Sequence, residues 1–149
     1  MSIHRVLTVA ATALTILAVF PIWNLYAGWA AHSALTAIVG EGAGQAIVSP
    51  VARGDGSFDA EITVNIHRAE PNTTFSIERA PDLVPDGVCT GLFIPFGETL
   101  TTSAGGAGAT HFQFHRDGFA AGVRFDVVFQ AVGSDGSILQ SDCMDVTIK

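Results

Sequence analysis

The chain has 149 residues, of which 48% are hydrophobic, and its 14 acidic and 7 basic residues give a formal net charge of −7. This length allows one domain with a substantial core. The acidic balance, with no basic stripe, argues against nucleic acid as a partner and against electrostatic docking on anionic lipid.

The N-terminal segment is strongly apolar. No lysine, arginine or acidic residue lies between Arg5 and Glu41. A basic start followed by an apolar run and then by small residues is the pattern of a secretory signal, and cleavage would follow Ala30 or Ser33. The sequence thus predicts a leader, a linker and a domain, which comprise residues 1–33, 34–44 and 45–149.

The same apolar run is long enough to span a bilayer as an uncleaved helix, which would anchor the chain through residues 6–31. Arg5 would then keep the short N-terminal end in the cytoplasm. In either case the rest of the chain is exported, to the periplasm, the cell surface or the extracellular space. Contact with a membrane is expected only through this segment, and only if it is not cleaved.

From about Gln45 onward, apolar and polar residues alternate with the period of two that is typical of β-strands. In the stretch FDAEITVNIHR, Ile62, Val64 and Ile66 share one face. Segments such as TTFSIER, THFQFH and VRFDVVFQAVG repeat the pattern, with glycine-rich turns between them. The sequence predicts an all-β fold after the leader helix, an antiparallel, immunoglobulin-like β-sandwich of about seven or eight strands.

The chain contains two cysteines, Cys89 and Cys143. In an exported protein an even pair predicts one disulfide bond. In the chain-entropy model, closing a loop of this length stabilises the fold by about 4 kcal/mol. The alternative is a pair of free thiols or a redox couple, but the C-x-x-C spacing that is typical of redox couples is absent.

The segment AEPNTTFSIER resembles the P-x-T-x-Y-x-V stretch of fibronectin type III and related immunoglobulin-like modules. Pro71, Thr73, Phe75 and Ile77 match that pattern, with Phe75 where the family usually has tyrosine. The resemblance implies a secreted sandwich that acts as a binding or spacer module, without catalytic residues.

Three histidines are candidate metal ligands: His67, His111 and His115. On an extended strand His111 and His115 lie roughly 13 Å apart, too far to share one ion. His67, from another strand, could approach one of them. The alternative reading is a solvated strand face, with Phe112 and Phe114 directed toward the core.

No known catalytic motif appears: the chain has no G-x-S-x-G, H-E-x-x-H, P-loop or G-x-G-x-x-G. We therefore expect no cofactor and a non-enzymatic domain that binds an unidentified protein or cell-surface ligand, or has a structural role. Two alternatives stay open. One is an exported copper- or zinc-binding or redox protein that uses the histidines, and the other is a small secreted hydrolase with an unrecognised site.

Overall fold

The computed structural model describes residues 30–149, which form nine β-strands and, within this range, no helix. The strands are β1 (Ala31–Val39), β2 (Ala43–Ala52), β3 (Ser57–His67), β4 (Thr74–Asp82), β5 (Ile94–Thr101), β6 (Gly108–Asp117), β7 (Arg124–Gly133), β8 (Ile138–Ser141) and β9 (Met144–Thr147). The all-β prediction is confirmed. The helix expected in the leader lies outside the described residues.

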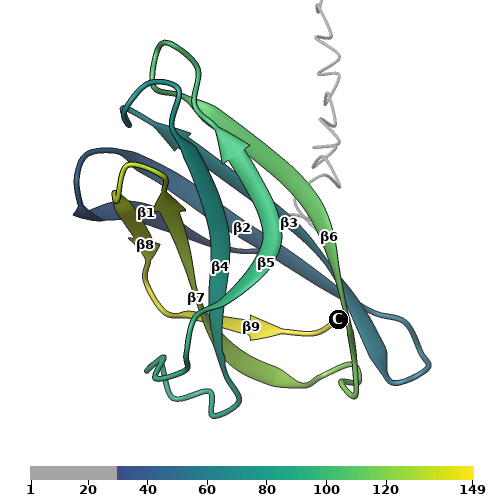
Figure 1. Ribbon diagram of the computed structural model, residues 1–149. Helices are drawn as coiled ribbons and strands as arrows, with labels where there is room; N and C mark the ends of the chain where they lie inside the picture. Colours follow the sequence, from purple (N-terminus) through teal and green to yellow (C-terminus); the bar gives the residue numbers. More distant parts are fainter. Residues whose placement is uncertain (1–29) are drawn as a thin grey trace, which may run out of the picture.

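All nine strands belong to one antiparallel sheet, in the order β5-β4-β7-β8-β1-β2-β3-β6, with β9 paired to β7. The sheet curls until its two edge strands, β5 and β6, lie side by side, although no backbone ladder joins these two strands (Figure 1). The result is a nearly closed barrel. The predicted sandwich of two sheets, with its immunoglobulin-like form, is not confirmed, because a single sheet carries every strand of residues 30–149.

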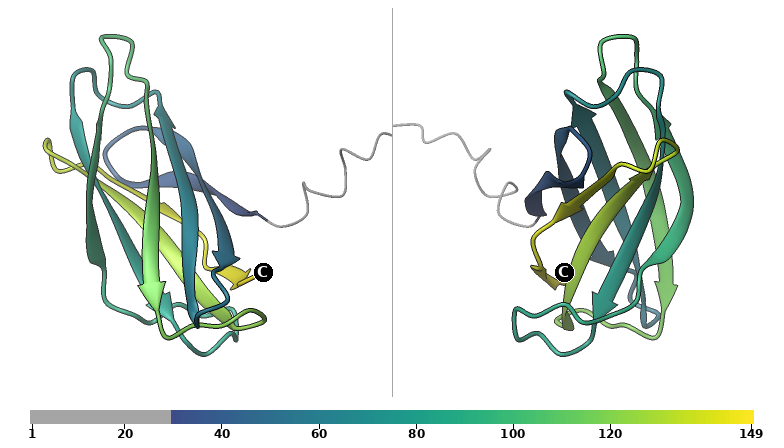
Figure 2. Two further views of the ribbon diagram at one scale, coloured as in Figure 1. Left: turned by 90° about the vertical axis from the view of Figure 1, so that its right-hand side faces the viewer. Right: turned by 60° about the vertical axis from the view of Figure 1, so that its left-hand side comes forward.

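The alternation of apolar and polar residues explains why the sheet curls around one interior. On β3, Ile62, Val64 and Ile66 are buried, while the residues between them are only half-buried and face outward. Closing the sheet removes the apolar faces from water, which is the main favourable term in folding. Figure 2 shows the long strands tilted around this common interior.

Strand β7 is covered on both faces. Phe125, Val127 and Phe129 are buried on the inner face, and Asp126 and Val128 are buried on the outer face. The outer face is covered because the connection between β4 and β5 crosses it. This connection, residues 83–93, is called the crossing loop below.

Residues 34–44, which we expected to form a linker, lie in the sheet instead. They belong to β1, to β2 and to the turn between these strands, and β1 pairs with β2 on one side and with β8 on the other. Leu35 is only 1% exposed. Gly40 and Gly42 form the turn at φ values of 77° and 128°, which side chains disfavour. The composition of this segment continues that of the leader, so the sequence alone does not mark it as part of the sheet.

The leader assigned to residues 1–33 lies mostly outside the described residues, but its last three residues begin β1. Ser33 is buried, and its hydroxyl accepts a hydrogen bond of 3.0 Å from the backbone N–H of Asp142. Cleavage after Ser33 would remove this part of β1, whereas cleavage after Ala30 would leave the strand whole. Over residues 30–149, no helix has the length and apolar character that crossing a membrane requires.

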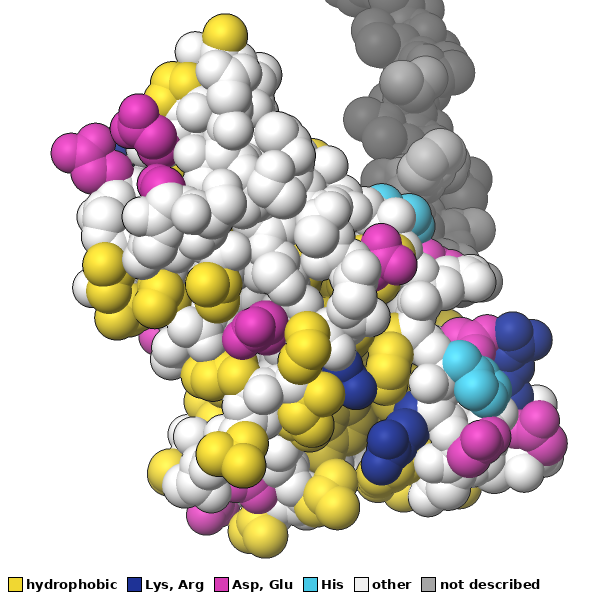
Figure 3. Space-filling model, viewed as in Figure 1, with side chains coloured by type: hydrophobic (Ala, Val, Ile, Leu, Met, Phe, Trp, Pro, Cys, Tyr) yellow, Lys and Arg dark blue, Asp and Glu magenta, His cyan; other side chains and the backbone are white. Residues whose placement is uncertain are grey.

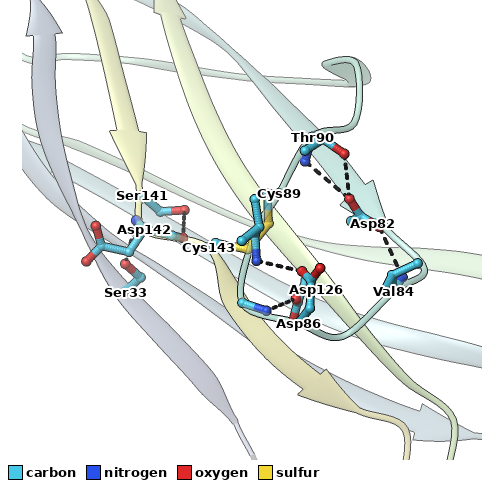
Figure 4. The surroundings of a disulfide bond; sticks show 12 residues. Ser33, Asp82, Val84, Asp86, Cys89, Thr90, Asp126, Ser141, Asp142 and Cys143 are labelled. Atoms are coloured by element: carbon cyan, nitrogen blue, oxygen red, sulfur yellow. Dashed lines mark hydrogen bonds between the residues drawn. A yellow bond between two sulfur atoms is a disulfide. The ribbon is translucent and has the colours of Figure 1, made fainter.

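Cys89 and Cys143 form the disulfide bond that the sequence predicted (Figure 4). Their Cα atoms are 5.6 Å apart, which is normal for a disulfide. The bond ties the crossing loop to the junction between β8 and β9. Disulfides are typical of proteins that fold in an oxidising environment outside the cytosol.

Candidate ligand pocket

An apolar pocket of about 280 Å³ lies inside the sheet, on the side where β5 and β6 meet. Its floor is buried, and its rim includes the exposed residues Leu83, Ile94 and Arg116. Figure 3 shows a hollow with hydrophobic side chains inside it and basic side chains beside it. The strands that line the pocket are β2, β3, β4, β5, β6 and β7.

Phenylalanine rings form much of the pocket wall. Phe96 of β5 is central: its ring centroid lies 5.0 Å from that of Phe112, 5.4 Å from that of Phe114 and 5.8 Å from that of Phe129. The first two pairs meet edge to face, a favourable arrangement for aromatic rings. Since Phe96 and Phe114 belong to the two edge strands, these contacts join the sheet edges where backbone hydrogen bonds do not.

Arg79 places a cation in this aromatic wall. It follows the buried Phe75 and Ile77 on the inner face of β4, so alternation directs its side chain into the barrel. Its guanidinium carbon lies 4.3 Å from the ring centroid of Phe96 and 4.2 Å from that of Phe114, which is cation–π geometry. Partial burial lowers the pKa of Arg79 below its usual value, and the nearby charge of Arg116 adds to this shift.

Arg116 lies at the pocket rim. It follows Phe112 and Phe114 on the inner face of β6, and its guanidinium carbon lies 5.9 Å from the ring centroid of Phe119. Its side chain remains exposed, so its charge stays hydrated at the mouth while Arg79 lies deeper. The pocket is therefore apolar inside and positively charged at its opening.

In the part of the chain that the structure describes, neither Arg79 nor Arg116 has an acidic partner. Within residues 30–149, Arg53 pairs with Asp59 and Arg124 pairs with Asp145, but no carboxylate lies within 4.0 Å of Arg79 or Arg116. Two arginines near each other without a carboxylate between them repel one another. The planar fork of an arginine matches the geometry of a carboxylate or phosphate.

The crossing loop forms one side of the rim and carries large apolar side chains that are exposed. They are Leu83, Val84, Val88, Leu92 and Phe93, and they continue into Ile94 at the start of β5. Two aspartates hold the loop (Figure 4): Asp82 accepts hydrogen bonds from Val84 N–H and Thr90, and Asp126 accepts one of 2.6 Å from Gly87 N–H. Together with the disulfide, these bonds fix an apolar rim beside the pocket.

The three candidate metal ligands lie outside the barrel and apart from one another. His111 contacts Glu61 at 2.9 Å, and His115 contacts Asp59 at 2.8 Å. The ring of His67, at the far end of β3, accepts a hydrogen bond of 3.3 Å from its neighbour Arg68.

The structure therefore does not bring the three histidines together, and over residues 30–149 no three His, Cys, Asp or Glu side chains are grouped so that they could hold a metal ion. Hydrogen bonds, to Asp59 first and then to Asp117, raise the pKa of His115, and the bond to His115 helps to lower the pKa of Asp59. These contacts make a polar outer surface over β3 and β6.

Sequence reasoning found the strand faces but missed Arg79 and Arg116. The signal was present: in TTFSIER the inward face runs Phe75, Ile77, Arg79, and in HFQFHR it runs Phe112, Phe114, Arg116. An arginine that ends an inward-facing apolar row marks the mouth of a barrel, but only if the sheet is known to close.

Comparison with known proteins adds no family to this description. No protein-family model matches the chain, and no curated protein matches it.

Proposed function

We propose that this chain is an exported, non-enzymatic binding protein and that the pocket inside its sheet holds a small apolar ligand. The observation that carries the proposal is the apolar cavity of about 280 Å³, with a buried floor and an exposed rim. Ligand sites are typically concave and largely apolar, with a few polar groups that fix orientation. This cavity lies near the lower end of their usual volumes, so the ligand is small.

The residues around the pocket favour binding over catalysis. The lining side chains are alanine, valine, leucine, isoleucine, proline, phenylalanine and arginine. None of these, apart from the arginines, has an ionisable or nucleophilic group, so the pocket lining offers no general base and no nucleophile. The hydrolase and metal-binding hypotheses find no comparable support in residues 30–149.

Two features support export. The disulfide requires an oxidising environment to form and persist. The N-terminal sequence has the order of a secretory signal or a membrane anchor, although that segment lies outside the described residues. The proposed location is the periplasm, the cell surface or the extracellular space. The likeness of residues 69–79 to fibronectin type III modules stays a prediction, and the binding role does not depend on it.

Binding of N-phenyl-1-naphthylamine tests the proposal, because this neutral fluorophore brightens in apolar surroundings. We expect saturable binding at one site. Ile94→Trp fills the pocket mouth and should weaken binding at least tenfold. Ile38→Trp is the matched control, since Ile38 is 61% exposed and lies outside the pocket. Both variants keep the same leader, so any binding of the probe to the leader contributes equally to the two measurements. No saturable binding, or equal binding by both variants, would contradict the proposal.

A further inference from the structure

We infer that the pocket selects an apolar molecule with an anionic head group, a carboxylate or a phosphate, which Arg79 and Arg116 bind at the mouth. This inference rests on the proposed function and adds the chemical class of the ligand. It rests on a juxtaposition: two arginines that have no acidic partner within residues 30–149 line an apolar cavity that opens to solvent.

The first step concerns charge. A partly buried cation is normally paired, because removing a charge from water is costly. Aromatic rings stabilise Arg79 in part, but the nearby like charge of Arg116 opposes its ionised form. A bound anion would relieve this repulsion and supply the missing partner. Cation–π contacts also hold the Arg79 guanidinium in place, so it loses little freedom on binding.

The second step concerns shape. The apolar tail of a ligand would lie against buried floor residues such as Ile62, Val127 and Phe129. Its head would then lie toward the exposed Arg116 and the half-buried Arg79. The cavity of about 280 Å³ lies near the lower end of the usual volumes of ligand sites, so a short apolar tail suits it better than a long lipid chain.

The third step excludes two other ligand types. A cationic amphiphile would bring a third positive charge to the mouth and would be repelled. A neutral alcohol could bury its tail but would leave both arginines without a charged partner. Charge-assisted hydrogen bonds are roughly twice as strong as neutral ones, so the anion should bind more tightly than an alcohol of equal length.

The test measures displacement of N-phenyl-1-naphthylamine from the exported protein by octanoate, octyl phosphate, 1-octanol and octylammonium. We expect at least one anion to bind ten times more tightly than octanol, and octylammonium to bind least. The stronger of the two anions shows whether the head group is a carboxylate or a phosphate. If octanol matches both anions, the inference fails while the proposed function stands. If none of the four compounds displaces the probe and the probe itself does not bind, both fail.

Substitution of each arginine shows which side chain gives the pocket its preference for an anion. Arg116→Gln should remove most of the preference for an anion without changing octanol binding, and Arg116→Lys should keep part of it. Arg53→Gln is the matched control, because Arg53 is an exposed arginine of residues 30–149 that pairs with Asp59 outside the pocket. Arg79→Gln should reduce the preference for an anion further, provided that this variant folds. Because Arg116 is exposed, its variants should fold normally, and they test the inference even if Arg79→Gln does not fold. An unchanged anion preference in Arg116→Gln would overturn it.

Discussion

The guanidinium carbon of Arg79, on β4, lies 4.2 Å from the ring centroid of Phe114, on β6. These two strands lie on either side of the place where the sheet fails to close with backbone hydrogen bonds. The contact therefore has two roles: it links β4, the neighbour of edge strand β5, to edge strand β6, and it holds a cation in the wall of the pocket.

Replacing Phe114 by leucine should weaken this closure. A cation–π contact contributes about 0.5–2 kcal/mol, depending on how far it is desolvated. Phe112→Leu is the matched control, because Phe112 packs against Phe96 on the same strand face and no arginine of residues 30–149 lies over its ring. We expect Phe114→Leu to lower the free energy of unfolding by about 1 kcal/mol more than the control, as measured by urea denaturation. If the excess persists in an Arg79→Met background, the cation is not its cause.

Loss of the disulfide should have a larger effect. Cys89 and Cys143 are separated by 54 residues in the sequence, and the chain-entropy model gives about 4 kcal/mol for a loop of this length. We expect the Cys89→Ser/Cys143→Ser protein to unfold at much lower denaturant concentration, and reduction of the wild-type protein to have the same effect. A loss below about 1 kcal/mol would mean that the remaining contacts fix the crossing loop without the bond.

Asp126 should matter more to the crossing loop than one hydrogen bond suggests. Its side chain is fully buried; one oxygen accepts from Gly87 N–H, and the other has no hydrogen-bond partner within the described residues. Asp126→Ala leaves the Gly87 donor unpaired, which costs about 1–3 kcal/mol. Asp86→Ala is the control, because Asp86 belongs to the same loop and accepts from Val88 N–H but is exposed.

Limited proteolysis measures directly how firmly the crossing loop is held in these two variants. We expect cleavage within residues 83–93 to become faster in Asp126→Ala than in Asp86→Ala. Equal cleavage rates in the two variants would show that the buried carboxyl does not hold the loop.

The contact between His115 and Asp59 on the outer surface predicts that the stability of the fold depends on pH. The folded protein raises the pKa of His115 above 6.5, so the stability it provides is fully present below pH 6.5 and is lost as the pH rises through the folded value. The pKa of Asp59 lies below 3.8 in the folded protein, so its contribution is present above pH 3.8 and is lost as the pH falls through that lower value. Both contributions are present between these limits.

His115→Gln should therefore lower the melting temperature more at pH 5.5 than at pH 8.5. In an NMR titration, Asp59→Asn should return the pKa of His115 toward 6.5, because the bond to Asp59 is the main cause of the shift. A melting-temperature difference that does not change with pH would contradict this reading.

The strand faces and the disulfide could be predicted from the sequence because they depend on local pattern and on cysteine count. Ile62, Val64 and Ile66 are buried as their alternation predicts. Cys89 and Cys143, the two cysteines of the chain, pair as expected.

The closure of the sheet could not be predicted, because strand order depends on contacts between distant segments. Nothing local shows that β6 pairs with β3 or that β5 lies beside β6. Without closure, Arg79 reads as an ordinary exposed end of a strand. Leu83 and Leu92 are also apolar, as core residues are, yet they lie in the crossing loop at 64% and 86% exposure.

The most direct test of ligand binding inside the barrel is methyl NMR during titration with octanoate. We predict shifts at the pocket methyl groups of Ile62, Ile94 and Val127, and none at the buried Ile66 and Leu139, which lie outside the pocket. Shifts confined to exposed residues away from the pocket, or no shifts at a saturating concentration, would contradict the account.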